Sequence, residues 1–307
     1  MKLRRLQDNE WDAVAELIYQ STNDWYERNL NHGIFSGPLS VARVFPEVYE
    51  AMDPGHCIVM EDEASGRLAG SCFFHPRETH FSLGIMNVHA DFGGQGIARQ
   101  ILEEILRLAD EAGKPVRLVS SAMNLDSFSL YTRSGFVPRA AFQDMILSIP
   151  EEGLGDPPPG VGRIRDAGPD DAAAMADLEM ELAHIRREQD YVHFIKNAAG
   201  IWHASVIESG NGIGIDGFLC SVNHPGSNLL GPGVMRTEAD ALALIHGELN
   251  QHAGRSPVFL VPVDRPELVG GLYARGAKNC ELHFCQVHGE FTPFSGIVMP
   301  TFMPETG

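Results

Sequence analysis

Apolar positions along the first half of the chain alternate between helical and extended spacing. Helical spacing predicts helices at 11–18, 41–52, 97–108 and 127–133. Extended apolar runs predict strands at 2–6, 57–61, 68–74, 83–88 and 116–120, with a closing strand pair between 136 and 147. The clearest helix begins after Gly96, because Ile97, Ile101 and Ile105 lie on one face of it. This half therefore predicts an α/β domain.

The second half repeats the same order of elements. It predicts helices at about 170–186, 188–197, 237–252 and 266–275. It predicts strands at 162–166, 202–208, 217–222, about 229–235 and 257–262, with further strands closing the chain. Short sequence segments of the two halves also match. Residues 115–119 resemble 257–261, and 130–133 resemble 272–275, both at an offset of 142. The pattern indicates an internal duplication.

A proline-rich segment separates the two repeats. Residues 149–160 include Pro150 and the run Pro157-Pro158-Pro159, which can continue neither a helix nor a strand ladder. We therefore expect one domain over 1–150, a linker over 151–160 and a second domain over 161–307.

Composition and charge narrow the class of protein. A chain of 307 residues with 44% hydrophobic content suits two ordinary cores. No apolar run is long enough to span a membrane and the first residues form no signal peptide, so we expect a cytoplasmic protein without a membrane partner. The net charge of −18 disfavours nucleic acid and suits a cationic substrate, although it also serves solubility. Five cysteines without a CxxC pair indicate reduced thiols and no metal site.

A glycine-rich turn lies between the strand at 83–88 and the amphipathic helix. Residues 87–98 read Asn-Val-His-Ala-Asp-Phe-Gly-Gly-Gln-Gly-Ile-Ala. Glycines allow close approach of the backbone to a ligand, and N–H groups at a helix start bind phosphate oxygens. The turn lacks the Gly-Lys-Ser/Thr of a Walker loop and the third glycine of a dinucleotide fingerprint. The segment therefore predicts phosphate binding by a fold other than those that carry a Walker loop or a dinucleotide fingerprint.

A second motif follows the turn. After the buried strand come Asn124 and then Leu-Tyr-x-x-x-Gly-Phe over 130–136. Together with Val-x-x-x-Phe-x-Gly-x-Gly-Ile-Ala over 88–98, this pattern resembles the acetyl-CoA signature of GNAT N-acyltransferases. The resemblance implies two tandem GNAT folds, each with a mixed, mostly antiparallel sheet flanked by helices, of which the first copy binds acetyl-CoA. One departure is Gly93, where the family usually has Arg or Gln.

The resemblance also implies a role for individual residues. Backbone groups of the strand end would contact the pantetheine arm and the thioester: Met86, Asn87 and Val88. The pyrophosphate would be bound by the turn and the helix start: Gly93, Gly94, Gln95, Gly96, Ile97 and Ala98. Asn124 would hold the pantetheine from the other side, with Ser127 nearby as a helix-start hydroxyl rather than a nucleophile. Asn124 is equally compatible with a plain N-cap.

Tyr131 is the candidate general acid. A phenol with a reference pKa of about 10 is matched to a departing alkyl thiolate. The alternative is that Tyr131 is only a core aromatic residue of a short helix. The general base is harder to assign because the strand 82–88 contains no carboxylate. His89 is our candidate, with His80 and Glu78 as alternatives, and a turn or surface role is the commoner one for each.

The second copy lacks the glycine turn. At an offset of 141, Thr237 and Ala239 correspond to Gly96 and Ala98, and Thr237 suits an N-cap. Glu238 and Asp240 would repel a pyrophosphate. Tyr273 occupies the position of the acid and is interpreted as a packing residue. The second domain is thus expected to be a GNAT-like fold without a cofactor site.

The resemblance implies an enzyme that moves an acetyl group from acetyl-CoA to a primary amine of a small molecule or peptide, by direct attack in a ternary complex and without a metal. Two alternatives remain open. One is an acyl-CoA sensor that catalyses nothing, and the other is an O-acetyltransferase of a small alcohol or sugar. Neither the acceptor nor an oligomeric state follows from the sequence.

Overall fold

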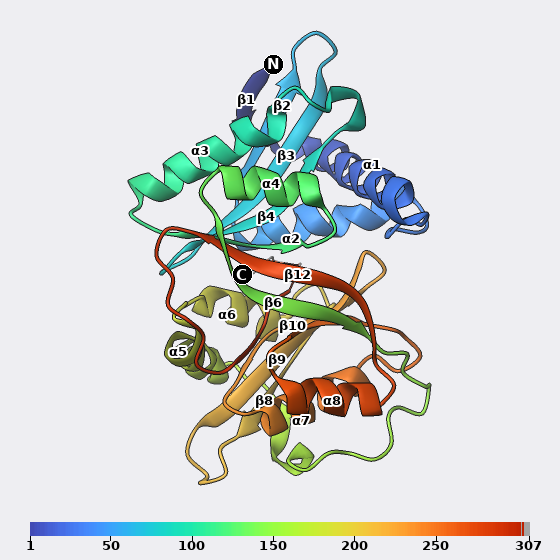
Figure 1. Ribbon diagram of the computed structural model, residues 1–307, viewed down its shortest axis with the longest axis vertical. Coiled ribbons are helices and arrows are strands. Elements are labelled where there is room, and N and C mark those ends of the chain that lie inside the picture. Colours follow the sequence, from blue (N-terminus) through green and yellow to red (C-terminus); the bar gives the residue numbers. More distant parts are fainter. Residues whose placement is uncertain (302, 304–307) are drawn as a thin grey trace. The chain divides into compact units, whose positions relative to one another are not determined.

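A computed structural model of the protein describes residues 1–301 and 303, which form two compact units (Figure 1). Unit 1 contains 1–76 and 80–116, and unit 2 contains 77–79 and 117–301. The end of the second predicted domain, 302 and 304–307, lies outside the described residues. Within the part that is described, no helix is both long and apolar enough to span a bilayer.

Unit 1 is an antiparallel sheet covered by helices. Its strands are β1 (Lys2–Arg5), β2 (Cys57–Asp62), β3 (Arg67–Pro76) and β4 (Phe81–Val88), paired in that order. Its helices are α1 (Trp11–Leu30), α2 (Val44–Met52) and α3 (Ile97–Glu111), with 3-10 turns η1 (Asp8–Glu10), η2 (Leu39–Arg43) and η3 (Ala90–Phe92). These elements confirm the order predicted from apolar spacing.

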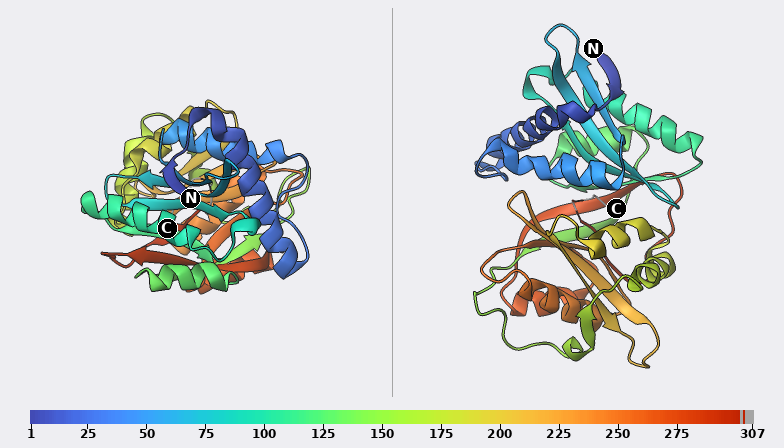
Figure 2. Two further views of the ribbon diagram at one scale, coloured as in Figure 1. Left: turned by 90° about the horizontal axis from the view of Figure 1, so that it is seen from above. Right: turned by 180° about the vertical axis from the view of Figure 1, so that it is seen from behind.

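The two faces of this sheet contact different helices, as side-chain alternation requires. On β3, a Cβ at Gly70 would lie 2.6 Å from the Cγ2 atom of Ile97, so Gly70 faces α3 at close range. Phe73, of opposite parity, packs against Tyr49 of α2 with ring centroids 4.7 Å apart. Helix α3 therefore covers one face, and α1 and α2 cover the other (Figure 2).

Strand β4 carries a bulge. Cys72 pairs with Met86 and Phe74 with Leu83, so β4 has one residue more than β3 between these pairs. Gly84 lies in the bulge, where a Cβ would be 2.8 Å from a backbone carbonyl oxygen of β3. Only glycine allows this close approach of the two backbones.

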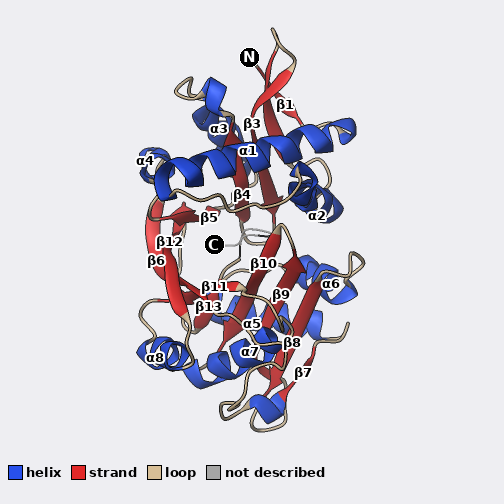
Figure 3. Ribbon diagram, turned by 90° about the vertical axis from the view of Figure 1, so that its right-hand side faces the viewer, coloured by secondary structure: helices blue, strands red, loops and turns tan. Residues whose placement is uncertain are grey.

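Unit 2 has a longer sheet with helices on both faces (Figure 3). Its strands run in the order β5 (Val116–Ser121), β12 (Lys278–His288), β6 (Val137–Ile146), β11 (Val258–Pro262), β10 (Ser227–Met235), β9 (Ile215–His224), β8 (Trp202–Glu208) and β7 (Ile164–Asp166), and β13 (Ile297–Met299) pairs with β10. Its helices are α4 (Leu125–Arg133), α5 (Asp171–Ala183), α6 (Glu188–Lys196), α7 (Glu238–Asn250) and α8 (Pro266–Ala274), with the 3-10 turn η4 (Val161–Arg163).

Strand β6 is shared between the two halves of the sequence. It pairs antiparallel with β12 on one side and with β11 on the other. The predicted strand pair between 136 and 147 is thus a single strand. The compact units divide near residue 116, and the domains over 1–150 and 161–307 with their linker over 151–160 stay a prediction. Apolar spacing identifies a strand, but it does not reveal which distant strands the segment will pair with.

The proline-rich segment is anchored rather than free. The Ile149 N–H donates to the carbonyl oxygen of Arg255 at 2.8 Å, and the Leu154 N–H donates to Oδ1 of Asn250 at 2.7 Å. These bonds hold 149–154 against the end of α7, so this part of the predicted spacer belongs to unit 2.

Alternation along β9 places two helices on opposite faces of this sheet. A Cβ at Gly217 would meet Leu244 of α7 at 3.1 Å. The next residue, Phe218, packs against Tyr191 of α6 with centroids 4.8 Å apart. Met145 of β6 is fully buried in the same apolar cluster as Leu244, so the shared strand contributes to the core of the second half.

A buried ion pair joins α5 to the loop before α6. Nε of Arg187 lies 2.9 Å from Oε1 of Glu179, and both side chains are almost fully buried. Burial raises the pKa of Glu179 more than the neighbouring guanidinium lowers it. Two residues along α5, Glu181 forms an exposed ion pair with Arg236. The two acids differ mainly in their access to water.

We expect Glu179→Gln to lower the free energy of unfolding by about 3–5 kcal/mol, because it leaves the guanidinium of Arg187 buried without its partner charge. Glu181→Gln is the matched control and should cost at most about 1 kcal/mol. Urea denaturation of both variants measures the difference. Similar small losses in the two would mean that Asp190, which also lies close to Arg187, supplies the compensating charge.

Candidate functional site

The glycine turn of unit 1 contains two residues in a backbone conformation that favours glycine. Gly94 and Gly96 have φ angles of +76° and +73°, in the left-handed region that favours glycine. A Cβ at either position would have nothing within 4 Å. The turn therefore requires glycine for its conformation, and the space in front of these residues is open to a ligand.

The backbone N–H groups at the start of α3 have no side-chain cap to accept their hydrogen bonds. Gly96 is the N-cap and offers no side chain, and the first turn of the helix contains no acidic residue. The Gln100 N–H donates to the carbonyl oxygen of Gly96, so the N–H groups of Ile97, Ala98 and Arg99 precede the helical ladder. Their uncompensated partial positive charge fits the oxygens of a pyrophosphate.

At the end of β4, the side chain of Asn87 contacts helix α1. Nδ2 of Asn87 donates to the hydroxyls of Ser21 at 2.8 Å and Thr22 at 3.2 Å, so the amide is directed at α1. Met86 and Val88 are half-buried and pair with β3. A contact of this strand end with pantetheine stays a prediction, and the structure assigns the Asn87 side chain to the packing of unit 1.

His89 takes part in the turn itself. Its Nδ1 accepts the N–H of Asp91 at 3.1 Å, which makes His89 the N-cap of η3, and its Nε2 lies 2.9 Å from Nη2 of Arg67. Both ring nitrogens thus have local contacts. The base role of His89 stays a prediction, while the observed geometry gives it a structural task.

The alternative bases also have local contacts. In unit 1, His80 is fully buried with Nε2 at 3.1 Å from the hydroxyl of Ser82. In unit 2, Glu78 is exposed and forms an ion pair with Arg186 at 3.1 Å.

In unit 2, helix α4 carries the second motif. Oδ1 of Asn124 accepts the Ser127 N–H at 3.0 Å, so the interpretation of Asn124 as an N-cap is confirmed. Asn124 and Ser127 are half-buried. Tyr131 is only 8% exposed, and its ring packs against Phe136 with centroids 5.7 Å apart. This packing fixes the direction of the phenol relative to α4.

The helix of the second half that corresponds to α3 is capped by its own side chains. Thr237 accepts the Asp240 N–H at 3.1 Å, as its sequence predicted, and Asp240 forms an ion pair with Arg163. Glu238 accepts the Leu268 N–H at 2.7 Å. These carboxylates occupy the helix start of α7, where a phosphate would meet like charge.

Tyr273 differs from its interpretation as a packing residue. It is 46% exposed, and its hydroxyl donates to Oε1 of Gln143 on β6 at 2.8 Å. The hydroxyl therefore links α8 to the shared strand rather than filling a core.

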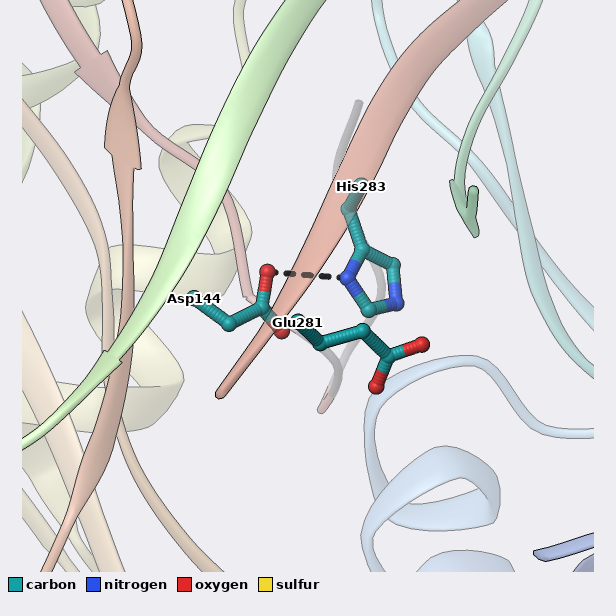
Figure 4. A group of neighbouring side chains, drawn as sticks. All are labelled: Asp144, Glu281 and His283. Atoms are coloured by element: carbon teal, nitrogen blue, oxygen red, sulfur yellow. Dashed lines mark hydrogen bonds and ion pairs between the residues drawn. The ribbon is translucent and has the colours of Figure 1, made fainter. Parts of the chain in front are cut away.

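A titratable cluster that sequence reasoning missed lies on β6 and β12 (Figure 4). Nδ1 of His283 is 2.9 Å from Oδ1 of Asp144, and both side chains are buried. Glu281, two residues before His283 on the same face, pairs across the strands with Asp144 and accepts the hydroxyl of Ser121. Asp144 and His283 are 139 residues apart, so only the pairing of β6 with β12 brings them together.

The cluster lies beside the entry to α4. The Ala122 N–H donates to the carbonyl oxygen of Leu282 at 2.8 Å, which places 281–283 next to the segment that leads into Asn124. Asp144, Glu281 and His283 each offer one oxygen or nitrogen atom, and these three atoms lie within 4.8 Å of one another. Such a set of ligands is one that a divalent cation accepts. Because Asp144 already occupies Nδ1 of His283, the arrangement is also that of an oriented imidazole base.

Comparison with known proteins places the glycine turn in a known family. Residues 53–138 match the family model described as an acetyltransferase (GNAT) domain. No curated protein matches the chain.

Solved structures resemble the chain over nearly its whole length. A protein from Pyrococcus horikoshii aligns with a TM-score of 0.73 at 12% identity, covering 97% of this chain and 94% of its own. A GCN5-related N-acetyltransferase from Sphaerobacter thermophilus aligns with a TM-score of 0.63 at 16% identity, covering 96% and 98%. A tandem GNAT protein from the clavulanic acid biosynthesis pathway aligns with a TM-score of 0.61 at 14% identity, covering 95% and 99%.

These likenesses show the fold, and the family model covers the segment with the glycine turn. The chain therefore carries a GNAT-type acetyltransferase domain within a tandem GNAT fold.

Proposed function

We propose that the protein transfers an acetyl group from acetyl-CoA to a primary amine, and that its first GNAT copy binds the donor. The observation that carries this proposal is the start of α3, where left-handed glycines precede a helix end without a side-chain cap or an acid. The segment lies within the residues matched by the acetyltransferase model. At the corresponding end of α7 the protein's own carboxylates fill the space, which supports a single donor site per chain.

The chemistry requires two proton movements. The amine nitrogen bonds to the thioester carbonyl carbon, the C–S bond breaks, and the sulfur leaves as a thiolate. Tyr131 donates a proton to that thiolate, since its ring is fixed by packing on α4. A base takes the proton that the amine loses on attack. Free CoA and an amide are the products.

For the base, the Asp144–His283 pair is a stronger candidate than His89. The carboxylate of Asp144 orients the imidazole of His283 through Nδ1, and an imidazole held in a fixed orientation can act as a proton acceptor. The pair borders the segment leading to Asn124 and Tyr131 in the same unit. His89 instead caps η3 and contacts Arg67.

The acceptor is proposed to be an amine that is a cation in solution, because the net charge of −18 attracts cations, and it loses one proton to solvent before its neutral nitrogen attacks. A panel of amines and matched alcohols with acetyl-CoA, followed by the release of free thiol, tests the proposal directly. Turnover with alcohols alone would make the protein an O-acetyltransferase. Binding of acetyl-CoA without turnover on any acceptor would make it a sensor.

We expect Gly96→Glu to weaken acetyl-CoA binding at least about 100-fold, roughly 2.7 kcal/mol at 1.4 per tenfold. The new carboxylate would compete for the helix-start N–H groups and strain a backbone with φ of +73°. Gly113→Glu is the matched control, because Gly113 has φ of +64°, equally open surroundings and a place at the opposite end of α3. Calorimetric titration measures both, and equal losses would remove the turn from the site.

Tyr131→Phe should lower kcat by about 10²–10⁴, the usual contribution of a positioned acid, with little change in the affinity for acetyl-CoA. The ring and its packing on Phe136 are retained, so only the proton is lost. Tyr273→Phe removes a hydroxyl bonded to Gln143 and should leave kcat within about twofold. Equal losses in the two variants would assign the hydroxyls to folding, and unchanged kcat in Tyr131→Phe would mean that water supplies the proton.

His283→Gln should reduce kcat by about 10²-fold or more, because no imidazole remains to accept the proton. Asp144→Asn should reduce kcat less, since it disturbs the orientation of the ring but leaves the base. His89→Gln is the comparison. If kcat falls about 10²-fold in that variant and stays unchanged in His283→Gln, the base is His89 and the Asp144–His283 pair is structural.

A further inference from the structure

Two carboxylates and an imidazole lie together on one face of β6 and β12, all within unit 2 (Figure 4). Asp144 pairs directly across the strands with Glu281, and His283 follows two residues later on the same face. One donor atom of each lies within 4.8 Å of the other two. The proposed acetyl transfer uses the imidazole and the acid that orients it, but it gives Glu281 no task.

The cluster differs from a group of surface acids because it is largely withdrawn from water. The side chain of Asp144 is 4% exposed and that of His283 is 7% exposed. Exposed acids are solvated and need no counterion, whereas buried charges are paired or coordinate a metal. Glu281 is only half-buried, so the cluster is not sealed from solvent and an ion can enter.

The three side chains do not balance their own charge. Carboxylates directly opposite each other on neighbouring strands repel. Within the described part of the chain, the carboxylate of Asp144 forms an ion pair with His283 alone, at 2.9 Å. Even a protonated imidazole would leave one of the two negative charges over. A divalent cation held by both carboxylates and a neutral imidazole brings the net charge of the group to zero.

The distances within the cluster suit a small ion. Nδ1 of His283 is 2.9 Å from Oδ1 of Asp144. Zinc binds nitrogen and oxygen at about 2.0–2.2 Å, so two of its ligand atoms lie roughly 3.0–3.5 Å apart. This pair of atoms therefore needs to open only slightly. Glu281 has the longer side chain of the two acids, and rotation about its bonds can close the remaining distance.

The surroundings and the donor types narrow the kind of ion. The hydroxyl of Ser121 on β5 donates to the carboxylate of Glu281, as outer hydrogen-bond partners of metal ligands do. Imidazole suits zinc and the neighbouring transition ions, whereas magnesium and calcium favour sites made of oxygen alone. No cysteine belongs to the three ligands, which is why the cysteine spacing indicated no metal.

We propose that Asp144, Glu281 and His283 bind one divalent transition ion of the zinc class. Three protein ligands leave a further position for water. Metal binding does not depend on acetyl transfer, but it excludes it. With the ion on one ring nitrogen of His283, the other nitrogen carries the proton, and no lone pair is left to act as the base. This inhibition, unlike the binding, rests on the proposed function.

Calorimetric titration of the full chain, free of metal and of any affinity tag, tests the site with Zn²⁺ as the probe. One Zn²⁺ should bind per chain, and Mg²⁺ and Ca²⁺ should not compete with it. Glu281→Gln removes a half-buried ligand and should weaken Zn²⁺ binding at least about tenfold. Glu267→Gln removes an exposed acid from α8 and is the matched control, with unchanged affinity. Absence of Zn²⁺ binding, or equal affinities in the two variants, would overturn the proposal.

Turnover separates binding from inhibition. Saturating Zn²⁺ should lower kcat of the unaltered protein at least about tenfold, and a chelator should restore it. Glu281→Gln keeps His283 but lacks one ligand, so it should need at least about tenfold more Zn²⁺ for the same fractional loss. Bound Zn²⁺ with unchanged kcat would overturn the inhibition. If no acceptor is acetylated at all, the proposed function fails, and calorimetry still decides whether the metal site exists.

Discussion

The pairing of β6 on both edges is the constraint on which unit 2 depends. Each edge is bonded to a strand from more than 100 residues later, so the strand that follows α4 takes both of its sheet partners from the second half of the sequence. The same pairing aligns Asp144 with Glu281 and His283. A duplication that exchanges strands in this way gives each copy residues that its own sequence does not contain. Loss of β12 would therefore remove both a sheet partner and the imidazole of the proposed base.

Equivalent helix starts in the two halves have opposite electrostatic character. Gly96 leaves the first N–H groups of α3 open, whereas Thr237 and Asp240 satisfy those of α7 and Arg163 neutralises the acid. A capped helix end gains stability and loses its attraction for phosphate. One fold can thus bind an anion or stabilise itself at the same point, depending on which residue precedes the helix.

Much of the fold was predictable from local patterns, because apolar spacing reports which face of a segment is buried. The order of helices and strands agrees with prediction, apart from the predicted strand pair over 136–147, and so does the Thr237 cap. Pairing over long distances was not predictable, since neither Asp144 nor His283 carries a local signal. The same limit explains the single strand β6 and the link between Tyr273 and Gln143. The local sequence around Asn87 also could not show that this side chain faces α1.

The two copies have diverged at the far ends of their matching helices as well. With Gly96 and Thr237 as equivalent N-caps, Glu248 and His252 of the second copy correspond to Arg107 and Glu111 of the first. Arg107 and Glu111 form an exposed ion pair, whereas Glu248 and His252 are buried beside a pocket. Burying a carboxylate and a neutral imidazole is costly unless their hydrogen bonds are met, and a surface ion pair contributes little. Equivalent positions of the two helices thus carry a solvent-exposed ion pair in the first copy and buried, hydrogen-bonded polar groups in the second.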